Sequence, residues 1–437
     1  MVRLLHRFRP RSFAELVDVL QYSLEHFFSD RLEREYEEWY RLVSRKPKEY
    51  QYIKVEEELP LPIRWWDLLY KIRGQGYVLN LNISSQVEDL QKILLFDYAA
   101  EILEKNGLIH PPDDKRLRQL MERGQQGVTK SRSYIYEMII AANYITYGFN
   151  VNMPQEKGSV DIVAEKDEEV YIECKVLEPP YWNTFTAKLF KLMNKRRINA
   201  ILTINVRKAP YSHREAELLS EKVLKAYENK TEFNEFTLQH VSLPYITEKN
   251  VEFLIGDPYF YLSMFLMNKL GVIQNVDYMS MAADVGIFNG KIKIREPKAV
   301  IIRYANKIDE LKKKLKRKLR EAKRKFKNIR IKHDANKLIC IDLSELTHEV
   351  IRIGEEKTVR MRANERILNE LKTFTSKWLK VNNDITDVIL TTIQLYVTPR
   401  GAPYVLNFKC IPVKNSKQLI YPKGWAIETL VVHGSKR

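Results

Sequence analysis

The spacing of hydrophobic positions along the chain changes from a helical period to a strand-like one. Residues 13–40 and 89–106 carry apolar side chains three or four positions apart, which predicts helices. Residues 131–147 form an almost wholly apolar helical pattern, and Gly148 follows where a helix should end. The first 125 residues are therefore expected to form a mainly helical accessory domain.

Two short runs typical of β-strands follow, 160–164 and 170–176, with a charged turn between them. Beyond them, helices and strands alternate. We expect helices at 184–197, 215–229, 307–327 and 365–381, and strands at 200–206, 337–343, 385–397 and 404–413. This order predicts an α/β core over 126–350, with an inserted α+β segment at about 180–297 and a C-terminal α/β extension over 351–437 that continues the core sheet.

The most regular helical pattern, at 307–327, separates apolar from basic positions. Its apolar side chains form one stripe, made by Ile308, Leu311, Leu315, Leu319, Ala322 and Phe326. The formal net charge of the chain is +17, and residues 303–332 hold 15 lysines or arginines against three acids. A patch this concentrated favours a polyanionic partner, nucleic acid above all, over a surface that only confers solubility.

The helix at 307–327 is thus expected to contact a phosphate backbone. The expected nucleic-acid-binding residues are Lys313, Lys316, Arg317, Arg320, Lys323, Arg324 and Lys327. DNA is favoured over RNA. The sequence leaves open a homodimer or additional protein subunits, and it also leaves open a role of this helix in docking to a partner protein or an anionic membrane surface.

Three widely spaced cysteines, Cys174, Cys340 and Cys410, do not suit a disulfide framework, so a reducing, cytoplasmic setting is expected. The N-terminus lacks an uninterrupted apolar segment, and no secretory signal is expected. No stretch approaches the roughly 20 apolar residues of a membrane-spanning helix. A glycine-rich phosphate loop is also missing from the sequence, which argues against ATP hydrolysis.

Candidate chemistry lies in the two strand-like runs. Side chains alternate between the faces of a strand, so Glu173 and Lys175 project to one face while Ile172 and Cys174 project to the other. A hairpin centred at Asp167 would place Asp161 directly opposite Glu173. Two facing carboxylates repel each other unless a positive group lies between them, and a hard divalent cation is the natural candidate.

A third acid, Glu137, falls within the apolar helix 131–147. Its neighbours along the helix are almost all apolar, so its carboxyl group is expected to be buried and to need a cation or hydrogen bonds.

A helix with a glutamate, then a hairpin with an aspartate on one strand and Glu-x-Lys on the next, resembles the PD-(D/E)XK nuclease superfamily. Here the pattern is Glu137, Asp161 and Glu173-Cys174-Lys175, and it covers about 45 residues. Val160 stands where the family often has proline. The resemblance implies a restriction-endonuclease-like fold, in which a mixed sheet is flanked by helices.

The resemblance also implies the chemistry of a metal-dependent endonuclease. Asp161, Glu173 and the backbone carbonyl of Cys174 would hold Mg²⁺ or Mn²⁺, and Glu137 would act directly or through a water. Lys175 would orient the attacking water or stabilise charge on the phosphate. Such a family usually adds a helix and a buried strand after Glu-x-Lys; 307–327 with 337–343 fits this better than 184–197 with 200–206.

Taken singly, each of these residues has a plainer interpretation. Asp161 suits the edge of a strand, Glu173 and Lys175 suit a solvated face, and Glu137 suits a helix surface. The main alternative function is a non-cleaving nucleic-acid-binding or scaffold protein that keeps a nuclease-like fold. The presence of all three acids together with the lysine favours the enzyme.

Overall fold

The computed structural model resolves two compact units, residues 1–178 with 311–437 and residues 179–310. The structure describes residues 13–44, 59–74, 84–112, 114–122, 124–156, 158–242, 278–288, 291–304, 306–329, 335–344, 348–353, 358–397, 405–414 and 426–431. Within these ranges, no helix is both long and apolar enough to cross a membrane.

The first unit begins with helices, as the spacing predicted. They are α1 (Phe13–Phe28), α2 (Asp30–Ser44), α5 (Leu61–Gly74), α6 (Ser84–Lys105), α7 (Lys115–Leu120) and α8 (Gly124–Thr146). The run 13–40, for which the spacing predicted helix, is helical but divided, because Ser29 adopts a left-handed backbone with φ of 52° and separates α1 from α2. Gly107 and Gly148, with φ of 67° and 81°, follow α6 and α8 as expected.

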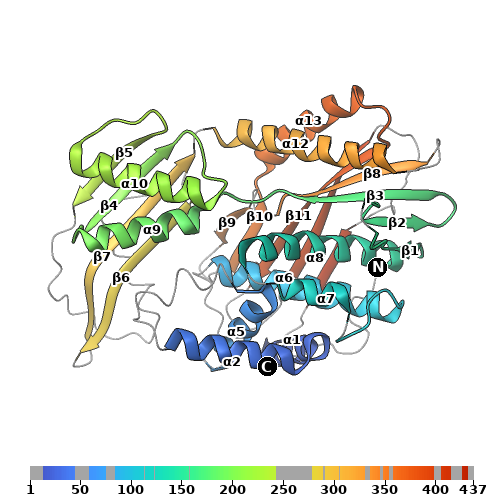
Figure 1. Cartoon of the computed structure of the whole chain (residues 1–437), viewed down its shortest axis with the longest axis horizontal. Coiled ribbons are helices and arrows are strands. Elements are labelled where there is room, and N and C mark those ends of the chain that lie inside the picture. Colours follow the sequence, from blue (N-terminus) through green and yellow to red (C-terminus); the bar gives the residue numbers. More distant parts are fainter. Residues whose placement is uncertain are drawn as a thin grey trace. The chain divides into compact units, whose positions relative to one another are not determined.

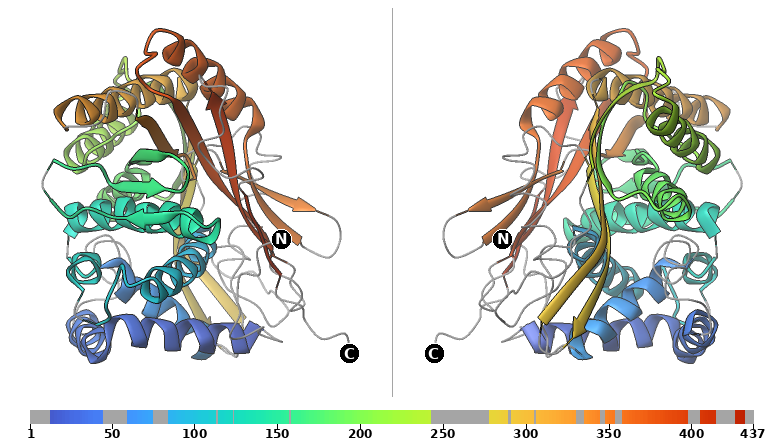
Figure 2. Two further views of the ribbon diagram at one scale, coloured as in Figure 1. Left: turned by 90° about the vertical axis from the view of Figure 1, so that its right-hand side faces the viewer. Right: turned by 90° about the vertical axis from the view of Figure 1, so that its left-hand side faces the viewer.

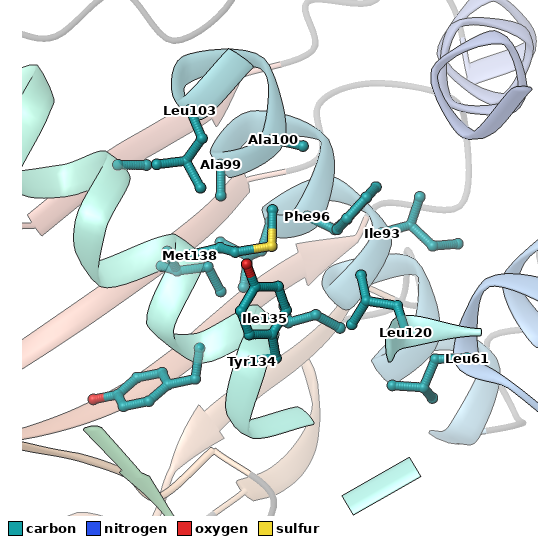
Figure 3. Packing of buried hydrophobic residues seen from close by; sticks show 14 of the residues in the cluster. Leu61, Ile93, Phe96, Ala99, Ala100, Leu103, Leu120, Tyr134, Ile135 and Met138 are labelled. Atoms are coloured by element: carbon teal, nitrogen blue, oxygen red, sulfur yellow. The ribbon is translucent and has the colours of Figure 1, made fainter. Parts of the chain in front are cut away.

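These helices are not a separate compact unit. Their buried side chains form one hydrophobic cluster with β-strand residues such as Ile172, Leu338 and Ile389. Figure 3 shows the centre of this cluster, where Phe96 and Ala99 of α6 face Ile135 and Met138 of α8. The boundary expected near residue 125 therefore does not divide the chain into two cores.

Nine strands form one mixed sheet within the described part of the first unit. They are β1 (Asn150–Asn152), β2 (Ile162–Glu165), β3 (Glu169–Val176), β8 (Asn336–Asp342), β9 (His348–Ile353), β10 (Thr358–Ala363), β11 (Asp387–Val397), β12 (Val405–Lys414) and β13 (Ala426–Val431). β2 and β3 are antiparallel, and Ile162 pairs with Ile172 while Glu165 pairs with Glu169. This register is the hairpin centred at Asp167 that the sequence predicted.

β8 completes the centre of the sheet by pairing in parallel with β3, so that Glu173 lies beside Ile339. Of the two helix–strand pairs considered from the sequence, α12 (Lys307–Asn328) with β8 is the one that joins this sheet. β11 extends the sheet in parallel from β8, and β12 follows antiparallel to β11.

Helices cover both faces of this sheet. Figures 1 and 2 show α8 on one face, and α12 with α13 (Glu365–Lys380) on the other. Strand alternation then sorts the residues of β3: Ile172 and Cys174 join the hydrophobic cluster beneath α8, whereas Glu173 and Lys175 turn toward α12.

The second unit has its own sheet and core. Its described strands are β4 (Ala200–Val206), β5 (Phe236–Ser242), β6 (Tyr278–Phe288) and β7 (Lys291–Tyr304), in the order β5-β4-β7-β6. Helices α9 (Trp182–Lys195) and α10 (His213–Asn229) pack against it through buried residues such as Phe185 and Val223. This unit spans 179–310, slightly more than the insertion expected at about 180–297.

Candidate active site

Asp161 and Glu173 meet on the α12 side of the sheet. Asp161 immediately precedes β2, and the hairpin register continues to place it opposite Glu173. The backbone N–H of Cys174 donates to Oδ2 of Asp161 over 2.8 Å, which fixes this carboxylate beside β3. Glu173 is fully buried, with a side-chain exposure of 0%. The two carboxylates therefore share one largely solvent-excluded place.

Lys175 supplies the first positive charge. Its Nζ is ion-paired with Glu173 and lies 3.9 Å from Oδ2 of Asp161. The same Nζ donates to the backbone carbonyl of Cys174 over 3.0 Å. The three oxygen groups that the sequence proposed as metal ligands thus converge on one ammonium group.

Lys325, on α12, supplies a second positive charge that the sequence reasoning missed. Its Nζ lies 2.7 Å from Oδ1 of Asp161 and 3.0 Å from Oε2 of Glu173. One ammonium group therefore bridges both carboxylates from the helix side. The available signal was its place on the helix: Lys325 directly precedes Phe326, at the border of the buried stripe, where a lysine can reach toward the sheet.

The protonation of the cluster follows from burial and from these charges. The pKa of Glu173 is raised to about 7, first by burial and then by the charge of Asp161, although Lys175 and Lys325 oppose the shift. Burial acts to lower the pKa of Lys175, but the negative charges of Glu173 and Asp161 outweigh it and raise that pKa. Both ammonium groups remain charged at neutral pH.

Glu137, on α8, lies near this cluster but takes no part in its hydrogen bonds and ion pairs. Its side chain is half-buried, and among the described residues it makes no hydrogen bond or ion pair. Burial is the main reason that the pKa of Glu137 is raised to about 8, and the charge of Asp161 adds to the shift while Lys175 opposes it. The carboxyl group therefore favours its protonated form at neutral pH.

The donor set fits a hard divalent cation. Asp161, Glu173 and the Cys174 carbonyl are oxygen donors that already surround a cationic group, as Mg²⁺ and Mn²⁺ require. No three His, Cys, Asp or Glu side chains within the described ranges are arranged to hold one metal ion.

The basic residues of α12 point in three directions. Six of the seven predicted nucleic-acid contacts are exposed on the outer face, and we call this set the outer stripe: Lys313, Lys316, Arg317, Arg320, Arg324 and Lys327. The first five of them, with Glu321, line an open groove along the helix.

Lys323 does not belong to the outer stripe, contrary to expectation. It faces the turn that follows α13, where its Nζ lies 2.6 Å from Asp384 and 2.9 Å from the side-chain oxygen of Asn382. Lys312 on the same flank pairs with Glu370 of α13 over 2.6 Å. These two ammonium groups stabilise the packing of α12 beside α13 and are already neutralised.

Comparison of the chain with protein-family models and with curated proteins finds no match. The geometry of the site therefore carries the functional argument.

Proposed function

We propose that the chain is a Mg²⁺- or Mn²⁺-dependent endonuclease that hydrolyses phosphodiester bonds of nucleic acid, with DNA favoured over RNA. The observation that carries the proposal is the convergence of Asp161, Glu173 and the Cys174 carbonyl around the Lys175 ammonium. A hairpin of this register beside a parallel strand and a covering helix suits the restriction-endonuclease-like fold of the PD-(D/E)XK superfamily.

In this proposal the side chains have separate tasks. Asp161, Glu173 and the Cys174 carbonyl would hold the ion, which when bound would activate a water and offset charge on the phosphate. Lys175 keeps a fixed positive charge beside the reacting phosphate, where it stabilises the extra negative charge of the transition state. Glu137, which carries a proton at neutral pH, exchanges that proton with water at the margin of the site.

The outer stripe supplies the affinity for the backbone of the substrate. Its six cations face one acid, Glu321, which Arg317 approaches to 3.6 Å. Exposed lysines and arginines on one helix face bind successive phosphates without reading sequence. The three cysteines, all free thiols, suit the reducing interior of a cell.

The direct test is cleavage of double-stranded DNA, single-stranded DNA and RNA with Mg²⁺, Mn²⁺ or EDTA. We expect metal-dependent cleavage that falls at least about a hundredfold in Asp161→Ala and in Lys175→Ala, because each variant removes one element of transition-state stabilisation. Lys312→Ala is the matched control, since this lysine pairs with Glu370 and not with the site. Cleavage that survives both site variants would refute the proposal.

One observation favours the alternative of a non-cleaving nucleic-acid-binding protein. Two lysines already neutralise the two carboxylates, so the cluster is stable without a metal ion. In that case the protein would bind DNA through the outer stripe with a strong salt dependence. It would cleave none of the substrates with any metal, and Asp161→Ala would leave DNA binding unchanged.

A further inference from the structure

The second lysine of the cluster is the feature that the proposed hydrolysis does not need. Lys325 comes from α12, not from the hairpin, yet its Nζ lies within 3.0 Å of both Asp161 and Glu173. Lys175 already contacts the same carboxylates from its own strand. The Lys325 ammonium thus occupies the side of the carboxylate pair that faces the helix.

Charge balance decides what this contact does. When both acids are ionised, as they are when they hold a metal ion, the two carboxylates and the two ammonium groups sum to zero, and Glu173 is fully buried. A divalent cation added to that cluster would leave an excess of two positive charges in surroundings of low dielectric, where repulsion between like charges is strong. One of the ammonium groups must therefore move away when an ion binds.

Lys325 is the group able to leave. Lys175 is held on β3 by the additional hydrogen bond from its Nζ to the Cys174 carbonyl, 3.0 Å away. The Lys325 side chain is more exposed, at 29% against 20% for Lys175, and has no such anchor among the contacts described above. Its four-carbon stem can carry the ammonium toward water without any movement of the backbone.

We infer that Lys325 competes with a divalent cation for the Asp161–Glu173 pair, and that its ammonium is exchanged for the ion when the site is loaded. The inference rests on the proposed metal site. In the metal-free protein Lys325 keeps the two carboxylates together. In the loaded protein the displaced ammonium is next in sequence to Arg324 of the outer stripe, where it becomes available to a substrate phosphate.

Calorimetric titration of the full-length protein with MnCl₂ tests the competition without reference to cleavage. We expect Lys325→Met to bind Mn²⁺ at least about tenfold more tightly than the unaltered protein, because a competing unit charge has been removed. Lys325→Arg keeps the charge and should bind Mn²⁺ with nearly unaltered affinity. Lys312→Met removes an ion pair with Glu370 from the same helix and should also leave it unaltered.

The outcomes separate the inference from the proposed function. If the unaltered protein and Lys325→Met bind Mn²⁺ with equal affinity, the inferred competition is wrong, although the proposed metal site is retained. If Lys325→Arg tightens binding as much as Lys325→Met, charge is not the cause and the inference fails. If neither the unaltered protein nor Lys325→Met binds Mn²⁺, the proposed metal site itself is overturned. Thermal unfolding of each variant without metal confirms that it is folded.

A second measurement follows the displaced ammonium. A phosphorothioate-linked DNA duplex resists hydrolysis, so its binding can be measured with and without Mn²⁺. We expect Lys325→Met to weaken duplex binding several-fold in Mn²⁺, when the ammonium is free, and to have little effect in EDTA, when it is held by the carboxylates. Equal weakening under both conditions would contradict the exchange.

Discussion

A half-buried carboxyl group in α6, outside the candidate site, shows how the helical part of the first unit shifts a protonation equilibrium. Asp97 of α6 accepts a hydrogen bond from the hydroxyl group of Ser23 in α1. Its pKa is raised from 3.8 to about 6, chiefly by burial, with a smaller contribution from Glu101 that adds to it and one from Ser23 that opposes it. Folding therefore shifts the protonation equilibrium of Asp97 toward the neutral acid.

This shift makes the stability of the protein depend on pH. Between pH 3.8 and about 6 the folded state binds more protons than the unfolded state, so stability falls as the pH rises through that window. Asp97→Asn removes the dependence. We expect it to raise the free energy of unfolding by about 3 kcal/mol above pH 7, since the pKa of Asp97 rises from 3.8 to about 6 and one pKa unit corresponds to about 1.4 kcal/mol, with no gain below pH 4.

Urea unfolding of both proteins at several pH values measures this difference. Ser23→Ala is the companion variant, because it removes the hydroxyl group that stabilises the ionised carboxylate. It should lower the stability at pH 7.5 and leave it nearly unchanged at pH 4. A gain from Asp97→Asn that is the same at every pH would show that the burial of charge is not its cause.

At the same scale, strand alternation was enough to find Glu173 and Lys175, because the neighbours of these residues are apolar. Asp161 followed from the register of the hairpin. Lys325 could not be found in this way, because its contacts with Asp161 and Glu173 join residues more than 150 positions apart. The helical pattern shows which face of α12 is buried, and the fold alone decides which acids that helix covers.

Helix ends provide a test at the scale of single elements. Ser29 lies between α1 and α2 with φ of 52°, a conformation that costs a residue with a side chain about 1–2 kcal/mol. Ser29→Gly should therefore raise the free energy of unfolding by about 0.5–1 kcal/mol, after the larger entropy loss of glycine on folding is subtracted. Chemical denaturation measures this gain.

Gly107 gives the matched comparison for this helix break. Its φ is 67°, so Gly107→Ala should destabilise the protein by about 1 kcal/mol. The two substitutions should change the free energy of unfolding in opposite directions if backbone conformation is the cause. A loss of stability in Ser29→Gly would contradict this explanation.

The faces of α12 predict different effects on DNA binding. Neutralising Lys316 and Arg320 of the outer stripe together should reduce the slope of log binding constant against log salt concentration by about 2, since each lost phosphate contact contributes about 0.9. Lys312→Gln with Lys323→Gln removes the same charge from the flank that faces α13 and should leave the slope nearly unchanged. Anisotropy titrations of labelled DNA over a range of salt concentrations measure both.

At the element scale, helices and strands could be predicted wherever the apolar positions followed a single spacing. The apolar stripe of α12 and the end of α8 at Gly148 were correctly predicted. The left-handed turn at Ser29 was missed, because serine gives little local indication of that conformation and the apolar spacing continues across it. Equally, an apolar/polar pattern cannot show that Lys323 meets Asp384, because that pair depends on how α12 packs beside α13.

At the scale of the whole molecule, the parallel pairing of β3 with β8 joins segments more than 160 residues apart. The sequence indicated this pairing only indirectly, because the regular apolar stripe of α12 favoured the helix–strand pair of α12 and β8. It gave no indication that the helices before residue 125 share one hydrophobic cluster with the sheet. Such long-range contacts arise because each amphipathic face must be buried against another element, and many partners satisfy that need equally well.

The chain leaves and re-enters the first unit at neighbouring points, which allows a test of the insertion. The Leu177 N–H donates to the carbonyl of Asp342 over 3.1 Å, and Lys314 Nζ donates to the carbonyl of Glu178 over 3.0 Å. A linker of about six glycine and serine residues can therefore replace residues 179–310. We expect the shortened chain to unfold cooperatively and to bind Mn²⁺ within about threefold of the full-length affinity, because every proposed ligand lies outside the deleted segment.

Asp161→Ala in the shortened chain should abolish that binding and serves as its control. Comparison of duplex binding by the two chains then shows what the second unit contributes. If the outer stripe holds the DNA by itself, the salt dependence of binding will be the same with and without residues 179–310. A shallower slope in the shortened chain would place additional phosphate contacts in the second unit. Failure of the shortened chain to fold would contradict the independence of the two cores that their separate clusters of buried side chains indicate.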